Sequence, residues 1–149
     1  MCKNLDIGGK KDEFDNNYRN LLNFGHTAGH AIEKISGLKG LNHGQAVAIG
    51  MIIAIDISIS LGLLKDSFRQ EIISLYTKLK LPYGLDIGEN PSSEKLADDV
   101  FNAMKFDKKF SASTNKFVLL KGINSPVFYH NVEEKVIKEA ILKNIEVKL

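Results

Sequence analysis

Arg19-Asn-Leu-Leu-Asn23-Phe-Gly-His26-Thr-Ala-Gly-His30 is the most informative segment of this sequence, and His43-Gly44 follows it closely. Together the two segments hold three of the four histidines of the chain. His26 and His30 are four residues apart, so a helix places both imidazoles on one face, about one turn apart. A third histidine then begins the next apolar segment. This clustering favours a site for a metal, for an anionic ligand, or for both.

Four polar residues share one face of the helix that the pattern predicts over residues 18–35. Arg19, Asn23, His26 and His30 are separated by four, three and four positions, which keeps them in one row. Such a row is poorly explained as core, and its composition is unusually specific for a merely solvated surface. Arginine suits phosphate or carboxylate, asparagine suits hydroxyl or carboxylate, and histidine suits a metal or proton transfer. Gly25 and Gly29, expected in mid-helix, would allow close approach of a ligand or of a packed neighbour.

The paired histidines alone are an ambiguous metal motif. Zinc readily takes imidazole nitrogen, and its catalytic sites use three protein ligands. Thr27 follows the first histidine where a zincin helix has its catalytic glutamate, so that motif is excluded. His43 strengthens the metal hypothesis if the second helix returns antiparallel beside the first. Glu33 fits solvation as well as it fits a role as a further partner.

Asp107-Lys108-Lys109 is a second charged cluster, in the loop before the expected hairpin. A pair of lysines in a loop is usually only solvated. The two lysines become better candidates for binding an anion if the loop folds back onto the histidine helix.

Length and composition bound the protein class. The chain has 149 residues, 44% of them hydrophobic, which suffices for one ordinary domain. A net charge of +2 gives no case for nucleic acid or a membrane as partner. The lone Cys2 excludes an internal disulfide and fits a reducing compartment, so we expect a cytoplasmic protein. We expect residues 1–11, which lack a signal-peptide apolar run, to be a flexible lead, and residues 12–149 to form a helical domain.

Hydrophobic periodicity predicts a mainly α fold, a multi-helix bundle with one small β-hairpin. The segment 46–64 is apolar enough to require a membrane check, but Asp56 and Ser58 interrupt it, and we interpret it as a buried central helix. Ser36-Gly37 and Leu81-Pro82 are the expected stops of the first and third helices. The expected helices span about 18–35, 43–62, 66–80, 91–104 and 133–144, and the expected strands 116–121 and 126–130.

Three motifs in this order resemble one enzyme family. Arg-x-x-x-Asn-Phe-Gly-His-Thr-x-Gly-His-Ala-Ile-Glu, His-Gly-x-Ala-Val-Ala-x-Gly-Met, and Asp-Lys-Lys before Phe-Val-Leu-Leu are similar to 3-dehydroquinate synthase, a sugar-phosphate cyclase. The resemblance extends from about residue 12 to the C-terminus. It covers only the C-terminal, mainly helical domain of that enzyme, without its N-terminal NAD-binding domain.

The resemblance implies a chemistry and a set of roles. The whole enzyme converts a seven-carbon phosphorylated keto acid to 3-dehydroquinate in the shikimate pathway, using NAD and zinc and eliminating phosphate. His26 and His43 would be zinc ligands, and His30 would lie near the phosphate and assist proton transfer. Arg19 and Asn23 would hold phosphate and carboxylate groups, so that the resemblance makes Arg19 and His30 the catalytic pair. Further substrate contacts would come from Asp15, which replaces a family glutamate, and from Lys108 or Lys109.

Departures from the family pattern limit what this chain can do alone. The third zinc ligand of the family is a glutamate of the NAD-binding domain, and this sequence has no G-x-G-x-x-G turn for NAD. Leu5, Asp15, Asn17 and Gln45 replace a lysine, a glutamate, a glycine and a glutamate of the family. We therefore expect an incomplete zinc site and no turnover by the isolated chain.

The expected partners are a small phosphorylated substrate and a separate NAD-binding domain. The sequence is also compatible with a second copy of the chain in a homodimer.

Two alternative functions stay open. The first is a degenerate, non-enzymatic helical module. The second is a domain like that of metal-dependent alcohol or glycerol dehydrogenases, against which the arginine–asparagine spacing and the Asp-Lys-Lys loop argue.

Overall fold

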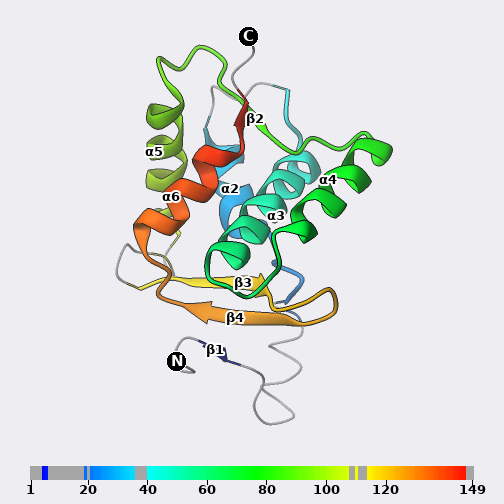
Figure 1. The fold of residues 1–149 in the computed structure, drawn as a ribbon. Helices are drawn as coiled ribbons and strands as arrows, with labels where there is room; N and C mark the ends of the chain where they lie inside the picture. The colour runs from blue at the N-terminus through cyan, green and yellow to red at the C-terminus, as the bar shows by residue number, and fades with distance from the viewer. Residues whose placement is uncertain are drawn as a thin grey trace.

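The computed structural model describes residues 5–6, 19, 21–35, 40–107, 110 and 114–146. Asp15, Lys108, Lys109 and the expected helix stop at Ser36-Gly37 lie outside these residues. The expected mainly α bundle with a small hairpin is confirmed (Figure 1). Its described helices are α2 (His26–Lys34), α3 (His43–Ser60), α4 (Ser67–Leu79), α5 (Ser93–Met104) and α6 (Glu134–Lys143). In Figure 1, α2 and α3 lie at the centre, with α5 and α6 on one side and α4 on the other.

Helix α3 is the core of the domain. It begins with a capping box in which the Asn42 side chain accepts from the Gln45 backbone and the Gln45 side chain accepts from the Asn42 backbone. Length and composition would allow α3 to cross a membrane, but 67% of its span is buried inside the protein. Ile49, Ile53 and Ile57 are all 0% exposed. The interpretation of this segment as a buried central helix is therefore confirmed.

A glycine breaks the helix that the sequence predicted over residues 18–35. Gly25 has a left-handed backbone with φ of 79°, and α2 begins only at His26. Arg19 is helical and Asn23 lies in the turn of residues 22–25 before α2; their carbonyls accept from the Leu22 and His26 amides. The expectation of one continuous row from Arg19 to His30, and of Gly25 in mid-helix, is therefore wrong. Gly29 does lie inside α2.

The glycines allow α2 and α3 to cross at backbone contact. A Cβ atom on Gly50 of α3 would lie 2.1 Å from the Gly25 carbonyl oxygen and 2.8 Å from the Gly29 nitrogen. A Cβ on Gly25 would lie 2.7 Å from the Met51 nitrogen. Because no side chain separates the helices here, the residues that follow Gly25 are held against α3.

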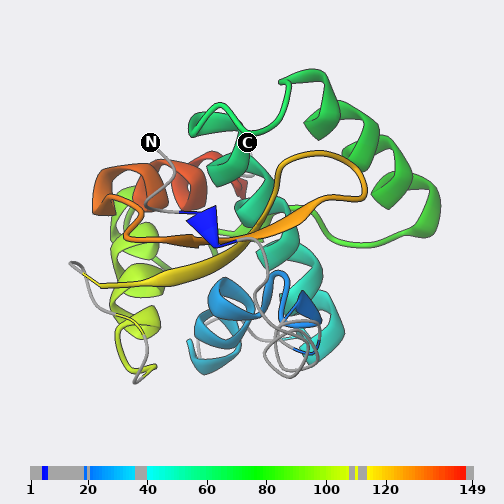
Figure 2. The same cartoon turned by 90° about the horizontal axis from the view of Figure 1, so that it is seen from below.

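The small sheet packs across one end of the helices (Figures 1 and 2). Strands β3 (Lys116–Leu120) and β4 (Pro126–His130) form the predicted antiparallel hairpin, in which Lys116 pairs with His130. On the other edge of β4 lies β1 (Leu5–Asp6), within the segment expected to be a flexible lead. A second, parallel pair joins β2 (Leu85–Asp86) to β5 (Ile145–Glu146). Neither β1 nor this second pair was predictable from the periodicity of the sequence.

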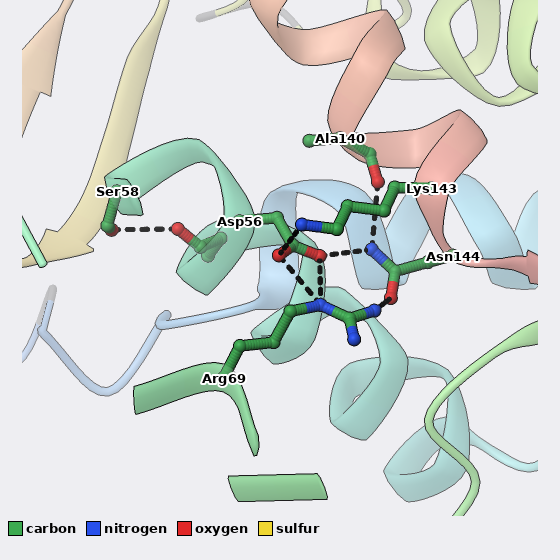
Figure 3. A network of polar contacts seen from close by, with 7 residues as sticks. Asp56, Ser58, Arg69, Ala140, Lys143 and Asn144 are labelled. Atoms are coloured by element: carbon green, nitrogen blue, oxygen red, sulfur yellow. Dashed lines mark hydrogen bonds and ion pairs between the residues drawn. The ribbon is translucent and has the colours of Figure 1, made fainter. Parts of the chain in front are cut away.

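A buried charged network ties three helices together (Figure 3). Asp56 of α3 is only 2% exposed, and its carboxylate accepts from Arg69 Nε of α4 at 2.8 Å. Asn144, which follows α6, donates to the same carboxylate at 2.6 Å and accepts from Arg69 Nη2 at 3.0 Å. Lys143 Nζ lies 3.6 Å from Asp56. These partners compensate a buried charge that would otherwise be costly.

Ser58, the other polar residue in the apolar segment, is also satisfied. Its hydroxyl, labelled in Figure 3, donates to a backbone carbonyl of α3, that of Ala54, at 2.8 Å. It also accepts from the Leu120 amide of β3 at 3.1 Å. The same hydroxyl therefore anchors the hairpin to the central helix.

Candidate metal and anion site

Three imidazoles converge where α2 and the start of α3 meet. The ring centroids of His26 and His30 are 5.3 Å apart, those of His26 and His43 5.6 Å, and those of His30 and His43 6.0 Å. His26 and His30 occupy successive turns of α2, and His43 is the first residue of α3. The antiparallel return of the second helix thus brings His43 beside the pair, as the metal hypothesis required.

The arrangement fits one metal ion. With Zn–N bonds of 2.0–2.1 Å and tetrahedral angles, two imidazoles on one zinc have ring centroids about 5 Å apart. The three observed separations are close to that value, so small rotamer changes are enough for any two of the rings to share an ion. His30 and His43 are exposed and His26 is half-buried, which leaves the cluster open to solvent. Imidazole nitrogen and carboxylate oxygen are both common ligands of zinc.

Glu33, for which the sequence left solvation and a role as a further partner open, contacts the histidine cluster. Its Oε2 lies 2.9 Å from His43 Nδ1, across the gap between α2 and α3. One donor atom each of His30, Glu33 and His43 lies within 4.8 Å of the others. The sequence pattern that could have indicated it is its i, i+3 spacing from His30, which puts both side chains on one face of α2.

A cleft of about 250 Å³ extends from the histidines towards the sheet. Asn23, His26 and His30 line one side, and Lys116 of β3 with Phe128 of β4 line the other. The remaining lining residues are Thr27, Asp107, Phe110, Phe117 and Val118. The cleft therefore combines hydrogen-bonding groups, imidazoles and a cation with aromatic walls.

Lys116 is a second residue that sequence reasoning missed. Its Nζ lies 4.2 Å from the centroid of the Phe128 ring, which holds the ammonium over the wall of the cleft. Among the described residues, no carboxylate forms an ion pair with it. Its position directly before Phe-Val-Leu-Leu in the sequence indicates the start of a strand and carries no further signal of a site residue.

The structure brings some of the expected site residues together and not others. Asn23, His26 and His30 line the cleft, and His43 joins the histidine cluster. Arg19 is exposed and is not among the described residues that line the cleft. Asp107 lines the cleft, while the two lysines that follow it and Asp15 fall outside the described residues.

Comparison with known proteins gives the same family as the sequence motifs. A family model described as 3-dehydroquinate synthase C-terminal matches residues 8–110. The 3-dehydroquinate synthase of Thermoanaerobacter pseudethanolicus is 36% identical over 139 residues, covering 91% of this chain and 37% of that protein. The 3-dehydroquinate synthase of Dichelobacter nodosus is 38% identical over 123 residues, covering 83% of this chain and 32% of that protein.

Solved structures share the fold. A 2-deoxy-scyllo-inosose synthase complexed with carbaglucose-6-phosphate, NAD+ and Co2+ superposes with a TM-score of 0.62 at 27% identity, covering 82% of this chain and 33% of that one. A 2-epi-5-epi-valiolone synthase from Streptomyces hygroscopicus with NAD+ and Zn2+ bound superposes with a TM-score of 0.60 at 19% identity, covering 89% of this chain and 38% of that one. The second likeness is one of fold alone.

Fold and motifs together define the class as the C-terminal domain of a sugar-phosphate cyclase. Within that class, the chain belongs to the 3-dehydroquinate synthase C-terminal family. The chain spans about a third of the length of the relatives it matches, between 32% and 37% for the two named here.

Proposed function

We propose that this chain is the zinc- and substrate-binding domain of a 3-dehydroquinate synthase, acting together with an NAD-binding domain. The whole enzyme would eliminate phosphate from a seven-carbon phosphorylated keto acid and cyclise it, in the shikimate pathway. The observation that carries the proposal is the convergence of three imidazoles, in the family's sequence order, beside a polar cleft. A reducing cytoplasm, consistent with a lone cysteine, is the compartment we propose.

His26 and His43 are the proposed zinc ligands of this chain. Their ring separation of 5.6 Å supports the assignment. A carboxylate from the NAD-binding domain would be the third ligand, which leaves one position for the substrate. When bound, zinc supplies a Lewis acid that polarises an oxygen of the substrate.

The other residues of the cleft would bind and orient the anionic substrate. Asn23 and His30 face the cleft from the α2 side, and Lys116 faces it from β3. A lysine ammonium and an imidazole on opposite walls suit a phosphate between them, with His30 placed to hold a proton there. Arg19, Asp15 and one of Lys108 and Lys109 remain proposed further contacts.

Complementation tests the proposal. The chain is mixed with the separately produced NAD-binding domain of the Thermoanaerobacter pseudethanolicus relative, and phosphate release from the phosphorylated keto acid is measured with NAD and zinc present. We expect no phosphate release from either part alone and turnover in the mixture. His26→Ala should abolish turnover in the mixture, while substitution of the fourth histidine, His130→Ala, should leave it in place.

The outcomes separate the alternatives. Phosphate release by the isolated chain would contradict the proposed division of labour. No turnover in the mixture, although the relative's two domains complement each other, would favour the degenerate module. Oxidation of a simple alcohol or of glycerol by the mixture, without release of phosphate, would favour a dehydrogenase-like domain.

A further inference from the structure

We propose that Glu33 is a positioning residue for the metal site. Its carboxylate accepts the Nδ1–H hydrogen bond of His43 and so leaves Nε2 of that imidazole free to bind the ion. The inference rests on the proposed role of His43 as a metal ligand. Glu33 would act on the metal site through His43.

The contact has the geometry of a hydrogen bond. Glu33 Oε2 and His43 Nδ1 are 2.9 Å apart, the usual length for N–H···O. Two ligand atoms on one tetrahedral zinc would be about 3.3 Å apart, given bonds of 2.0–2.1 Å. The observed distance therefore favours hydrogen bonding over shared coordination. Because one ring nitrogen donates to the carboxylate, the other is the one available to an ion.

Hydrogen bonds like that between Glu33 and His43 are common in metal sites. A histidine ligand commonly donates its second N–H to a carboxylate, which fixes the tautomer and the ring orientation. His43 needs such a partner because it is the first residue of α3, and its side chain is 57% exposed. Without Glu33 the ring would be free to rotate away from His26. Glu33 is fixed on α2, the helix that also carries His26 and His30, so one rigid element orients all three imidazoles.

Stability does not explain the pair. Both side chains are substantially exposed, at 57% for His43 and 34% for Glu33. Exposed ion pairs contribute little to the free energy of folding. Loss of the pair should therefore leave the fold in place and change the metal site.

Zinc titration by calorimetry of the wild type, Glu33→Ala, Glu33→Gln and a control tests the inference. Glu71→Ala is the matched control, since Glu71 is an exposed glutamate on α4. We expect Glu33→Ala to weaken zinc binding about 10- to 100-fold. Glu33→Gln should retain most of the affinity, since its amide oxygen still accepts from Nδ1–H. The control should bind as the wild type does.

Nitrogen-15 NMR of metal-free protein, at a pH where the imidazoles are neutral, is the second readout. We expect the proton of His43 on Nδ1 in the wild type and in Glu33→Gln, and a loss of that preference in Glu33→Ala. A merely structural glutamate would not control the tautomer. The melting temperature measured in parallel should stay close to that of the wild type.

Each contrary outcome has a distinct meaning. If the wild type binds zinc and Glu33→Ala binds it equally well, the inference fails and the proposed function stands. If Glu33→Gln is as weak as Glu33→Ala, Glu33 is itself a ligand and the positioning role is wrong. If the wild type binds no zinc in the presence of the NAD-binding domain, the proposed metal site and this inference fall together.

Discussion

Gly50→Ala should both destabilise the fold and weaken the metal site. The added Cβ would lie 2.1 Å from the Gly25 carbonyl oxygen, whereas real Cβ contacts are essentially never under 3.0 Å. The helices must therefore separate by about 0.9 Å at this point. The contacting atoms are backbone atoms, so rotation of a side chain cannot relieve the contact.

The expected cost follows from two opposing effects. Overpacking of a well-packed interior typically costs about 1–3 kcal/mol. Replacing glycine by alanine in a helix contributes about 1 kcal/mol in the opposite direction. Because the clash is between backbones, we expect the upper part of the range and a net loss of about 2 kcal/mol. For a chain of this length, that lowers the melting temperature by about 4–8 °C.

The assay is thermal and urea unfolding followed by circular dichroism, together with zinc titration. Gly44→Ala is the matched control, because it lies in the same helix and its Cβ would meet only Asn42 Oδ1, at 3.5 Å. The control should be neutral or more stable by up to about 1 kcal/mol. Gly50→Ala should also bind zinc more weakly, because the displacement moves His26 away from His43. Equal stabilities of the two variants would refute the claim that backbone contact sets the crossing.

Further predictions concern the core. Asp56→Ala should lower the free energy of unfolding by about 3–5 kcal/mol in urea titration, because Arg69 would keep a half-buried charge without its partner. Asp66→Ala is the control, because Asp66 is exposed and its side chain makes no cap hydrogen bond. This control should change the free energy of unfolding by less than about 0.5 kcal/mol. A loss for Asp56→Ala as small as for Asp66→Ala would contradict this account of the network. Burial raises the pKa of Tyr76 from 10.0 to about 12. As the pH rises, the unfolded chain therefore loses the phenol proton before the folded protein does, which favours unfolding. The free energy of unfolding should fall by up to about 3 kcal/mol between pH 10 and 12. Unfolding curves of Tyr76→Phe should lack this part of the alkaline loss; the same decline in both proteins would mean that the hydroxyl bonded to the Ala48 carbonyl is not responsible.

The elements with strong local patterns were predictable from the sequence. Helix α3 has a capping residue at Asn42 and a long apolar run, and both determine its start without help from the rest of the chain. The hairpin from Lys116 to His130 was predictable for a similar reason, because two apolar runs flank a short turn. The same holds for the three histidines, whose spacing on α2 and whose place at the start of α3 were both visible.

The parts that failed depend on contacts between distant segments. Gly25 looks like a helix interior residue by periodicity, and only its contact with α3 explains why the chain turns there. Two-residue strands such as Leu5–Asp6 have no pattern of their own and exist because β4 offers an edge. Asp56 gains its partners from Arg69 and Asn144, which are 13 and 88 residues away in sequence. The pairing of Glu33 with His43 likewise appears only once the helices are packed.

The proposed function requires His26, His30 and His43 to act as one site. A zinc titration followed by histidine ring resonances in NMR tests it most directly, with His130 on β4 as the internal control. We predict that the ring signals of the three clustered histidines change together and saturate at one zinc per chain, while those of His130 stay in place. Separate midpoints for the three rings, or equal changes at His130, would contradict the account.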